Sequence, residues 1–213
     1  MKLLAECRLY SFVDTAFLHG RPPEAVAEDL CRGGSDVIQL RAKNSTPEEV
    51  LVMARRILPI TRQAGVALVI NDHPSIAAEI GAEYCHLGQE DFFDAGISRP
   101  SRGENHAATG LGLSTHSPAQ AGRALAADPD YIAIGPVYAT GTKPGATPVT
   151  LEYVRWAAEH VKIPWFAIGG INLDNIAGVL AAGARRVCVV SAILDSPDIT
   201  RACREFKNRL DGT

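Results

Sequence analysis

The chain has 213 residues, of which 46% are hydrophobic and 21% are charged, and its formal net charge at neutral pH is −3. This composition is typical of a globular enzyme with one sizeable core, and the negative charge argues against general nucleic-acid binding, which needs a basic field. No apolar run reaches the roughly 20 residues that a membrane-spanning helix needs, and the start of the chain lacks the pattern of a signal peptide.

Short apolar runs and longer amphipathic stretches alternate along the whole chain. The runs have the length of buried strands, and the stretches between them have the periodicity of helices. The predicted strands are 9–13, 37–40, 67–70, 84–87, 111–113, 131–134, 165–168 and 187–190. The predicted helices are 23–31, 47–63, 117–127, 151–160, 173–182 and 198–210.

Several of these helices carry start and stop signals. Thr46 and Ser117 each stand before a proline, which is the arrangement of a capping residue followed by proline at the first helical position. Gly65, Gly81 and Gly183 each come shortly before a predicted strand, as glycines at helix C-termini do. These signals support the division into alternating strands and helices.

Eight strands with helical crossovers predict a parallel sheet, and eight such units in a chain of this length fit an α/β fold of the (β/α)₈ type, a TIM barrel. We expect one domain over residues 1–213. A doubly wound open sheet is the alternative, but no G-x-G-x-x-G motif follows the first strand. Residues 92–109 contain glycine, proline and many polar residues, so we expect a long loop there with at most one short helix.

The residues best suited to chemistry, most of them polar, follow the ends of the predicted strands. In a barrel of this type, these ends and the loops after them form the active face. Chance would not collect such residues at one end of seven strands. They are Gln39, Arg41, Lys43, Asn71, Asp72, His86, Gln89, Glu90, Asp91, Ser114, Thr115, His116, Tyr138, Thr140, Thr142, Lys143, Gly169, Gly170, Val190 and Ser191.

Gln39, Arg41 and Lys43 lie at alternate positions at the end of the second predicted strand. Side chains alternate along a strand, so the three are expected on one face. An amide and two cations are costly inside a protein unless an anion pairs with them. A bound phosphate or diphosphate would do so. The alternative is a solvated edge strand with a basic face.

Two further loops predict a phosphate site. Gly169 and Gly170 follow the seventh strand, and Ser191 follows the eighth. In barrels, these two loops commonly bind phosphate through backbone N–H groups, and glycine allows a close approach. The alternative is that the glycines only make a turn and that Ser191 caps a helix.

Asp72 and Asp91 stand just beyond two consecutive strands. Two carboxylates with waters and a phosphate suit the octahedral coordination of Mg²⁺. The alternatives are a helix cap for Asp72 and a solvated loop acid for Asp91.

Two more side chains have open roles. Lys143 lies in a loop rich in glycine and threonine and could fold over a bound phosphate as a lid; the alternative is a mobile surface loop. His116 could carry a proton, since histidine titrates near neutrality, or pack at a helix start.

Taken together, these motifs resemble the thiamine-phosphate synthase family over nearly the full length of the chain. The segments that carry the resemblance are 10–14, 39–43, 70–72, 86–91, 112–116, 135–138, 140–145, 168–171 and 190–191. Each is short, but their order and their positions at the strand ends are specific.

The resemblance implies an Mg²⁺-dependent transferase that joins a hydroxymethylpyrimidine diphosphate to a thiazole phosphate, or to its carboxylated form, and releases pyrophosphate. It implies a dissociative reaction in which pyrophosphate leaves before the thiazole nitrogen attacks. The implied pyrimidine-diphosphate residues are Gln39, Leu40, Arg41, Ala42, Lys43, Asn71, Ser114 and Lys143, of which Arg41, Lys43, Ser114 and Lys143 would be catalytic. The implied thiazole-phosphate residues are Thr140, Gly141, Thr142, Gly170, Val190 and Ser191; Asp72 and Asp91 would bind the metal, and Tyr10 and His86 are candidates for ring contacts.

Two other functions remain as rivals: a thiazole tautomerase on a related barrel, which needs neither diphosphate nor metal, and a non-catalytic barrel that senses phosphate. The intact set of Arg41, Lys43, Asp72 and Asp91 argues against both.

The five cysteines form no C-x-x-C pair, which indicates reduced thiols in a cytoplasmic protein and argues against a zinc site. We expect small-molecule partners, without nucleic acid or membrane, and the sequence leaves both a monomer and a homo-oligomer open.

Overall fold

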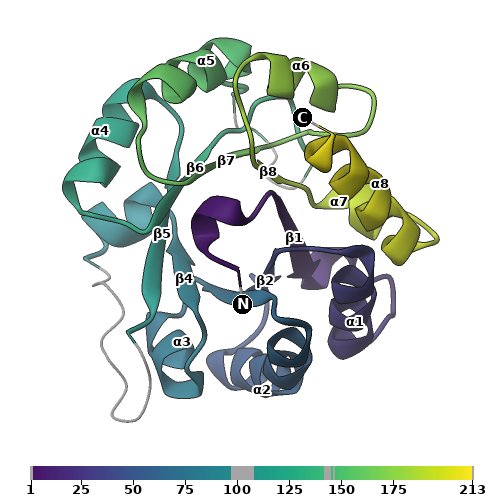
Figure 1. The fold of residues 1–213 in the computed structure, drawn as a ribbon. Helices are drawn as coiled ribbons and strands as arrows, with labels where there is room; N and C mark the ends of the chain where they lie inside the picture. The colour runs from purple at the N-terminus through teal and green to yellow at the C-terminus, as the bar shows by residue number, and fades with distance from the viewer. Residues whose placement is uncertain (1, 97–107, 142–144, 146, 213) are drawn as a thin grey trace.

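Eight parallel strands close into a barrel in the order β1 to β8 in the computed structural model, and helices surround the barrel (Figure 1). The structure describes residues 2–96, 108–141, 145 and 147–212. The strands are β1 Leu9–Asp14, β2 Val37–Arg41, β3 Ala67–Asn71, β4 Tyr84–Leu87, β5 Gly110–Thr115, β6 Tyr131–Ile134, β7 Trp165–Ile168 and β8 Val187–Cys188. Because β8 pairs with β1, the sheet has no free edge. The predicted (β/α)₈ fold is confirmed, and the open doubly wound sheet is excluded.

Six of the helices lie at the predicted stretches, and α3 and α7 are two further ones. The helices are α1 Pro23–Gly33, α2 Pro47–Ala64, α3 Pro74–Ile80, α4 Pro118–Ala126, α5 Thr150–His160, α6 Ile176–Ala181, α7 Ser191–Leu194 and α8 Ile199–Asp211. Three short turns complete the described part of the chain: η1 Leu4–Glu6, η2 Thr15–Phe17 and η3 Glu90–Asp94.

The predicted helix signals act as expected. The Thr46 hydroxyl accepts from the backbone N–H of Glu49 at 3.3 Å, and the Glu49 carboxylate accepts from the N–H of Thr46, which forms a capping box at the start of α2. The Ser117 hydroxyl caps α4 by accepting from the backbone N–H of Gln120 at 3.2 Å. Gly65 ends α2 in the left-handed conformation, with a φ of 68°, which a residue with a Cβ would adopt at a cost.

Aromatic rings fill the inside of the barrel. The rings of Tyr10 and Tyr131 both pack edge-on against Phe166, with centroid distances of 5.2 Å and 5.6 Å. Gly112 makes room for this cluster, because a Cβ at that position would lie 2.1 Å from the Tyr131 ring. The barrel is therefore a packed core, and only its ends are open to ligands.

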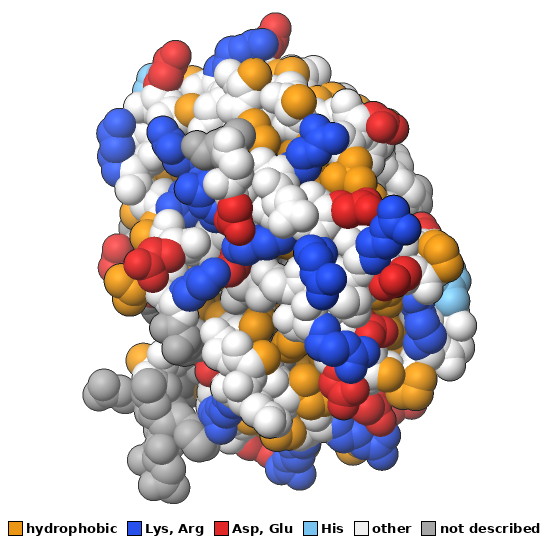
Figure 2. Space-filling model, turned by 45° about the vertical axis from the view of Figure 1, so that its right-hand side comes forward, with side chains coloured by type: hydrophobic (Ala, Val, Ile, Leu, Met, Phe, Trp, Pro, Cys, Tyr) orange, Lys and Arg blue, Asp and Glu red, His pale blue; other side chains and the backbone are white. Residues whose placement is uncertain are grey.

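The amino-terminal end of the barrel is closed by the chain itself. Figure 1 shows the segment before β1, which includes η1, lying across this opening. The Asp36 carboxylate anchors it, because it accepts from Lys2 Nζ at 2.6 Å, Lys207 Nζ at 2.5 Å and the N–H of Arg8 at 2.8 Å. Figure 2 shows the surrounding surface, where Lys and Arg side chains alternate with Asp and Glu side chains. The open end is therefore the opposite one.

Two details differ from the sequence prediction, and a third agrees with it. Strand β8 stops at Cys188 instead of residue 190, because the backbone at Val190 leaves the extended conformation and α7 begins at once. Strand β2 stops at Arg41, so Lys43 lies in the loop beyond the strand. At the start of the expected loop 92–109, one short π-helical turn covers residues 90–94, which agrees with the prediction of at most one short helix; residues 97–107 lie outside the described part of the chain. None of the helices described is long and apolar enough to cross a bilayer.

Candidate active site at the carboxyl ends of the strands

Side chains and loops from five strand ends line one cavity of about 130 Å³ at the carboxyl end of the barrel. A second, outer cavity of about 570 Å³ shares Thr140, Gly170 and Ser191 with the first and adds Gly141. The candidate residues in the inner cavity are Arg41, Ser114, His116, Thr140, Gly170, Val190 and Ser191. The structure therefore brings residues expected at a diphosphate site and residues expected at a phosphate site into contact with one space.

Arg41 reaches this cavity from the end of β2 and is held by a buried carboxylate. Its Nη1 donates to Asp14 Oδ2 at 2.7 Å, and the Asp14 side chain is only 1% exposed. The other oxygen of Asp14 accepts from the N–H of Ala16 at 3.0 Å, which fixes the carboxylate at the end of β1. A guanidinium held in this way keeps its remaining N–H groups for a ligand.

A small polar cluster lies at the ends of the neighbouring strands β2 and β3. It consists of Lys43, Asn71 and Asp72. Lys43 Nζ and Asn71 Nδ2 both donate to Oδ2 of Asp72, the second at 2.7 Å. Asp72 has a left-handed backbone with a φ of 63°, which is uncommon for a residue with a side chain and is frequent at functional sites. The N-cap of α3 is His73, so Asp72 does not act as the helix cap that the sequence left open.

Asp72 and Asp91 lie beyond β3 and β4, which are adjacent in the sheet and paired at Asn71 and His86. The two carboxylates therefore sit on one rim, as a shared cation requires. A Cβ on Gly88 would lie 2.8 Å from Asp91 Oδ2, so the absence of a side chain at Gly88 leaves space for the Asp91 carboxylate. Hard oxygen donors of this kind fit Mg²⁺. The described residues contain no group of three His, Cys, Asp or Glu side chains that could hold a metal by themselves.

Inside the barrel, Ser114 is connected to Gln39 by a line of hydrogen bonds. Ser114 Oγ lies 2.9 Å from His86 Nε2, and His86 Nδ1 lies 3.0 Å from the Tyr131 hydroxyl. The Tyr131 hydroxyl lies 3.0 Å from that of Tyr10, which accepts from Gln39 Nε2 at 2.6 Å. Burial lowers the pKa of His86 to about 4, with a smaller opposing effect of the Asp72 charge, so the imidazole is neutral at pH 7.

The loops after β7 and β8 form another part of the cavity lining. Gly169 and Gly170 have φ values of 107° and 63°, and a Cβ on Gly170 would lie 2.5 Å from the carbonyl oxygen of Ala139. This turn therefore requires glycine and brings bare backbone to the cavity. Ser191 is the first residue of α7, and Val190 is its N-cap, so Ser191 is not the cap that the sequence allowed.

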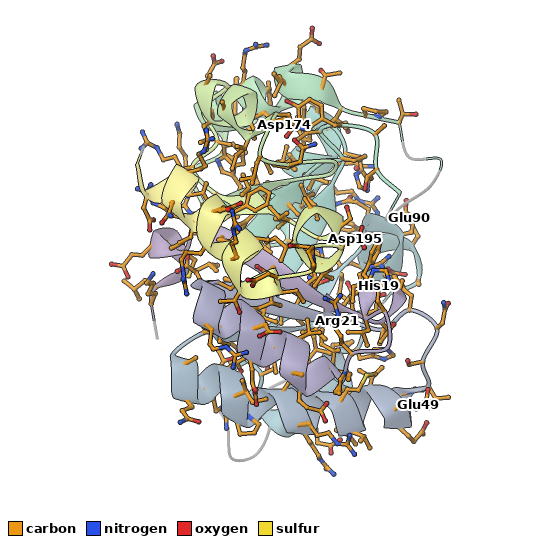
Figure 3. The ribbon with its side chains drawn as sticks, turned by 90° about the vertical axis from the view of Figure 1, so that its right-hand side faces the viewer. His19, Arg21, Glu49, Glu90, Asp174 and Asp195 are labelled. Atoms are coloured by element: carbon orange, nitrogen blue, oxygen red, sulfur yellow. The ribbon has the colours of Figure 1, made fainter. Side chains whose placement is uncertain are left out.

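The end of α7 is hydrogen-bonded to the loop after β1. Figure 3 shows His19 and Asp195 close together at the rim, with Arg21 beside them, on the same side of the barrel as Glu90. His19 Nε2 lies 2.7 Å from Asp195 Oδ1, and Arg21 Nη2 donates to the carbonyl of Leu194 at 2.6 Å. These contacts join the end of α7 to the loop between β1 and α1, which is its neighbour in the closed barrel because β8 pairs with β1.

Other candidate residues have different surroundings. Tyr10, Leu40 and Ala42 are buried, at 1%, 1% and 7% exposure, so the Leu40 and Ala42 side chains belong to the core. His116 lines the cavity, and its Nδ1 is hydrogen-bonded to the carbonyl of Gly135. Thr142 and Lys143 lie outside the described residues.

The sequence reasoning did not assign roles to three side chains that support this site. Asp14 holds Arg41, and Tyr131 connects Tyr10 with His86. Gln89 Nε2 donates to the carbonyl of Ser114 at 2.6 Å, and its buried Oε1 has no partner among the described residues. Asp14 could have been found, since it follows the first predicted strand just as Asp72 follows the third.

Comparisons with known proteins agree with this geometry. The sequence profile of the family described as thiamine monophosphate synthase matches residues 9–193. A thiamine-phosphate synthase of Thermus thermophilus is 48% identical over 186 residues, covering 87% of this chain and 87% of the relative. A thiamine-phosphate synthase of Acidothermus cellulolyticus is 43% identical over 210 residues, covering 97% and 96%. A solved structure of thiamine phosphate pyrophosphorylase from Pyrococcus furiosus superposes with a TM-score of 0.83 at 26% identity, covering 99% of this chain and 98% of the other.

Proposed function

Because the chain belongs to the thiamine monophosphate synthase family, we propose that it joins a hydroxymethylpyrimidine diphosphate to a thiazole phosphate, forming thiamine phosphate and releasing pyrophosphate. It is an enzyme, a transferase of thiamine biosynthesis. We place its work in the cytosol, a setting that the free cysteines support, since thiols remain reduced there.

The observation that carries this proposal is the composition of the inner cavity. One part of its lining is the Arg41 guanidinium, and another part is the Gly170 turn with the Ser191 hydroxyl. An arginine suits a diphosphate, and bare backbone with a hydroxyl suits a second phosphate. Two anionic substrates can therefore lie side by side with their uncharged parts in contact.

Asp72 and Asp91 would hold Mg²⁺ at the edge of this cavity, together with waters and oxygens of the diphosphate. When bound, the ion would supply neutralising charge for the diphosphate. In this structure, the Lys43 ammonium is paired with the Asp72 carboxylate. Because the Lys43 side chain is 48% exposed, it can move from the carboxylate to a ligand without breaking any contact in the core.

In the proposed reaction, the bond between the pyrimidine methylene carbon and the diphosphate oxygen breaks, and its electron pair leaves with pyrophosphate. Arg41 and Lys43, with Lys143, would stabilise the charge that develops on the leaving oxygens. The thiazole nitrogen then donates its lone pair to the methylene carbon, and the new carbon–nitrogen bond completes thiamine phosphate. Ser114 would orient the pyrimidine ring, and the small cavity would keep water away from the reactive carbon.

The decisive experiment incubates the pure protein with both substrates and measures thiamine phosphate and pyrophosphate by mass spectrometry, with Mg²⁺ and with excess chelator. We expect both products in equal amounts, and only with the metal. Full turnover in chelator would refute the metal role. A protein that isomerises a thiazole phosphate but never forms pyrophosphate would instead be the tautomerase.

Single substitutions test which substrate each part of the cavity binds. Arg41→Ala should raise KM for the pyrimidine diphosphate and lower kcat, and Asp91→Ala should remove most activity while the fold remains. Arg55→Ala is the matched control, because Arg55 is exposed on α2 and, in the part of the chain that the structure describes, forms an ion pair with Glu79 alone. A change confined to the affinity for thiazole phosphate in Arg41→Ala would mean that the two subsites are reversed.

A further inference from the structure

Five polar side chains from five different strands form one continuous line of hydrogen bonds inside the barrel. In order they are Gln39, Tyr10, Tyr131, His86 and Ser114, with successive distances of 2.6 Å, 3.0 Å, 3.0 Å and 2.9 Å. The line starts in the core and ends at the cavity, where Ser114 forms part of the wall. Among the described residues, the two tyrosine hydroxyls have no other hydrogen-bond partner.

Counting protons along this line fixes the direction of every bond. The amide nitrogen of Gln39 can only donate, so the Tyr10 oxygen accepts and its proton goes to Tyr131. The Tyr131 proton then goes to Nδ1 of His86. This nitrogen is therefore the acceptor of a neutral imidazole, and the ring proton is on Nε2. Nε2 donates to Ser114 Oγ, so the hydroxyl proton of Ser114 remains for a partner in the cavity.

We propose that this line of hydrogen bonds fixes Ser114 as a donor toward the substrate, with Gln39 and His86 as positioning residues that set its direction. The substrate atom that meets Ser114 is then an acceptor. The identity of that atom rests on the proposed function: it is a ring nitrogen of the aminopyrimidine and not the exocyclic amino group. A site built in this way distinguishes an acceptor edge from a donor edge before the substrate binds.

Gln39 sets the direction because its amide nitrogen, and not its amide oxygen, faces the Tyr10 hydroxyl. A carboxylate in its place can only accept, so Gln39→Glu should reverse every bond. The His86 proton would then move to Nδ1, and Ser114 would donate to His86 Nε2. In this variant, Ser114 would present only acceptor lone pairs to the cavity. The variant keeps the shape of the side chain and changes only which groups can donate.

The direct test is the tautomer of His86, measured in the ligand-free protein by nitrogen-15 NMR of labelled imidazole, with His86→Gln used to assign the signal. We expect the proton on Nε2 in the wild type and on Nδ1 in Gln39→Glu. A purely structural role for Gln39 would leave the tautomer unchanged. A wild-type proton on Nδ1 overturns the proposal, and the wild-type spectrum decides this even if the variant does not fold.

The second test measures binding of the pyrimidine diphosphate and of analogues in which one ring nitrogen is replaced by C–H or the amino group by hydrogen. We expect one ring analogue to bind the wild type roughly three- to tenfold more weakly, the value of one neutral hydrogen bond, and Ser114→Ala to abolish that difference. If Ser114→Ala instead abolishes the effect of removing the amino group, the proposal is overturned. If the wild type binds no pyrimidine diphosphate, the proposed substrate is wrong, and the tautomer still decides the direction of the line.

Discussion

The burial of His86 makes the stability of the fold depend on pH in a range where carboxylates contribute little. Its side chain lies between Tyr131 and Ser114, and the residue is 8% exposed. Burial lowers the pKa of this imidazole to about 4, whereas in the unfolded chain it titrates near 6.5. Between these values, the unfolded chain binds a proton that the folded chain does not, so acid favours unfolding.

The pKa difference sets the size of this effect. The stabilisation is present in full above about pH 6.5 and is lost as the pH falls toward the folded-state pKa of about 4. One pKa unit corresponds to about 1.4 kcal/mol, so the free energy of unfolding should fall by about 2 kcal/mol by pH 5 and about 3 kcal/mol by pH 4. At pH 5 most carboxylates are still ionised, so that point isolates the histidine.

The assay is urea unfolding at a series of pH values from 7.5 to 5, for the wild type and for His86→Gln. The variant lacks the titrating ring, so we expect it to be less stable at pH 7.5 but to lose about 2 kcal/mol less on acidification. Every other histidine and carboxylate is common to both proteins, and its contribution cancels in the difference. Parallel curves for the two proteins would refute the reasoning.

Three other substitutions test the packing and the loops. Asp36→Asn removes the carboxylate charge that pairs with the ammonium groups of two lysines. Because that carboxylate is 2% exposed, we expect the free energy of unfolding, measured in urea, to fall by about 3 kcal/mol or more, and a loss under about 1 kcal/mol would contradict this. Gly112→Ala places a methyl group 2.1 Å from the Tyr131 ring, so we expect a loss of roughly 1 to 3 kcal/mol in the same assay and a displaced tyrosine hydroxyl; an unchanged unfolding midpoint would count against it. Gly170→Ala places a methyl group 2.5 Å from the Ala139 carbonyl, so we expect KM for the thiazole phosphate to rise about tenfold or more, with KM for the diphosphate little changed; equal changes in both would argue against separate subsites.

The sequence was sufficient to predict the barrel because period, capping and turn chemistry agree in almost every unit. Strands β4, β6 and β7 have their predicted bounds, and α2 begins directly after the predicted capping residue Thr46. The failures are at places where the backbone leaves regular geometry for local reasons. Strand β8 is shorter than predicted because α7 starts soon after it. The valines at 189 and 190 favour a strand, so their intrinsic propensities do not indicate that the strand ends before them.

The site could be predicted only in part, because a sequence pattern places residues at a rim but does not say which of them pair. The rule that polar residues follow strand ends was correct for Arg41, Ser114 and Ser191, which share one cavity. It could not show that Gln39 turns inward to a tyrosine hydroxyl, which depends on the tyrosines of β1 and β6 meeting across the barrel. Long-range contacts of this kind depend on closure of the barrel.

Arg41 and Lys43, the two cations at and after the end of β2, differ in how firmly they are held. The sequence suggested that buried cations need an anionic ligand, but the fold already provides carboxylates: Asp14 for Arg41 and Asp72 for Lys43. The Asp14 carboxylate is buried and also accepts from a backbone N–H, so moving Arg41 away would leave a buried charge without its counter-ion. The Lys43 pair is half-exposed, and pairs of this kind contribute about 1 kcal/mol or less. We therefore expect Arg41 to remain fixed as a preorganised donor, whereas Lys43 moves to the incoming diphosphate and leaves the Asp72 oxygen free for a cation.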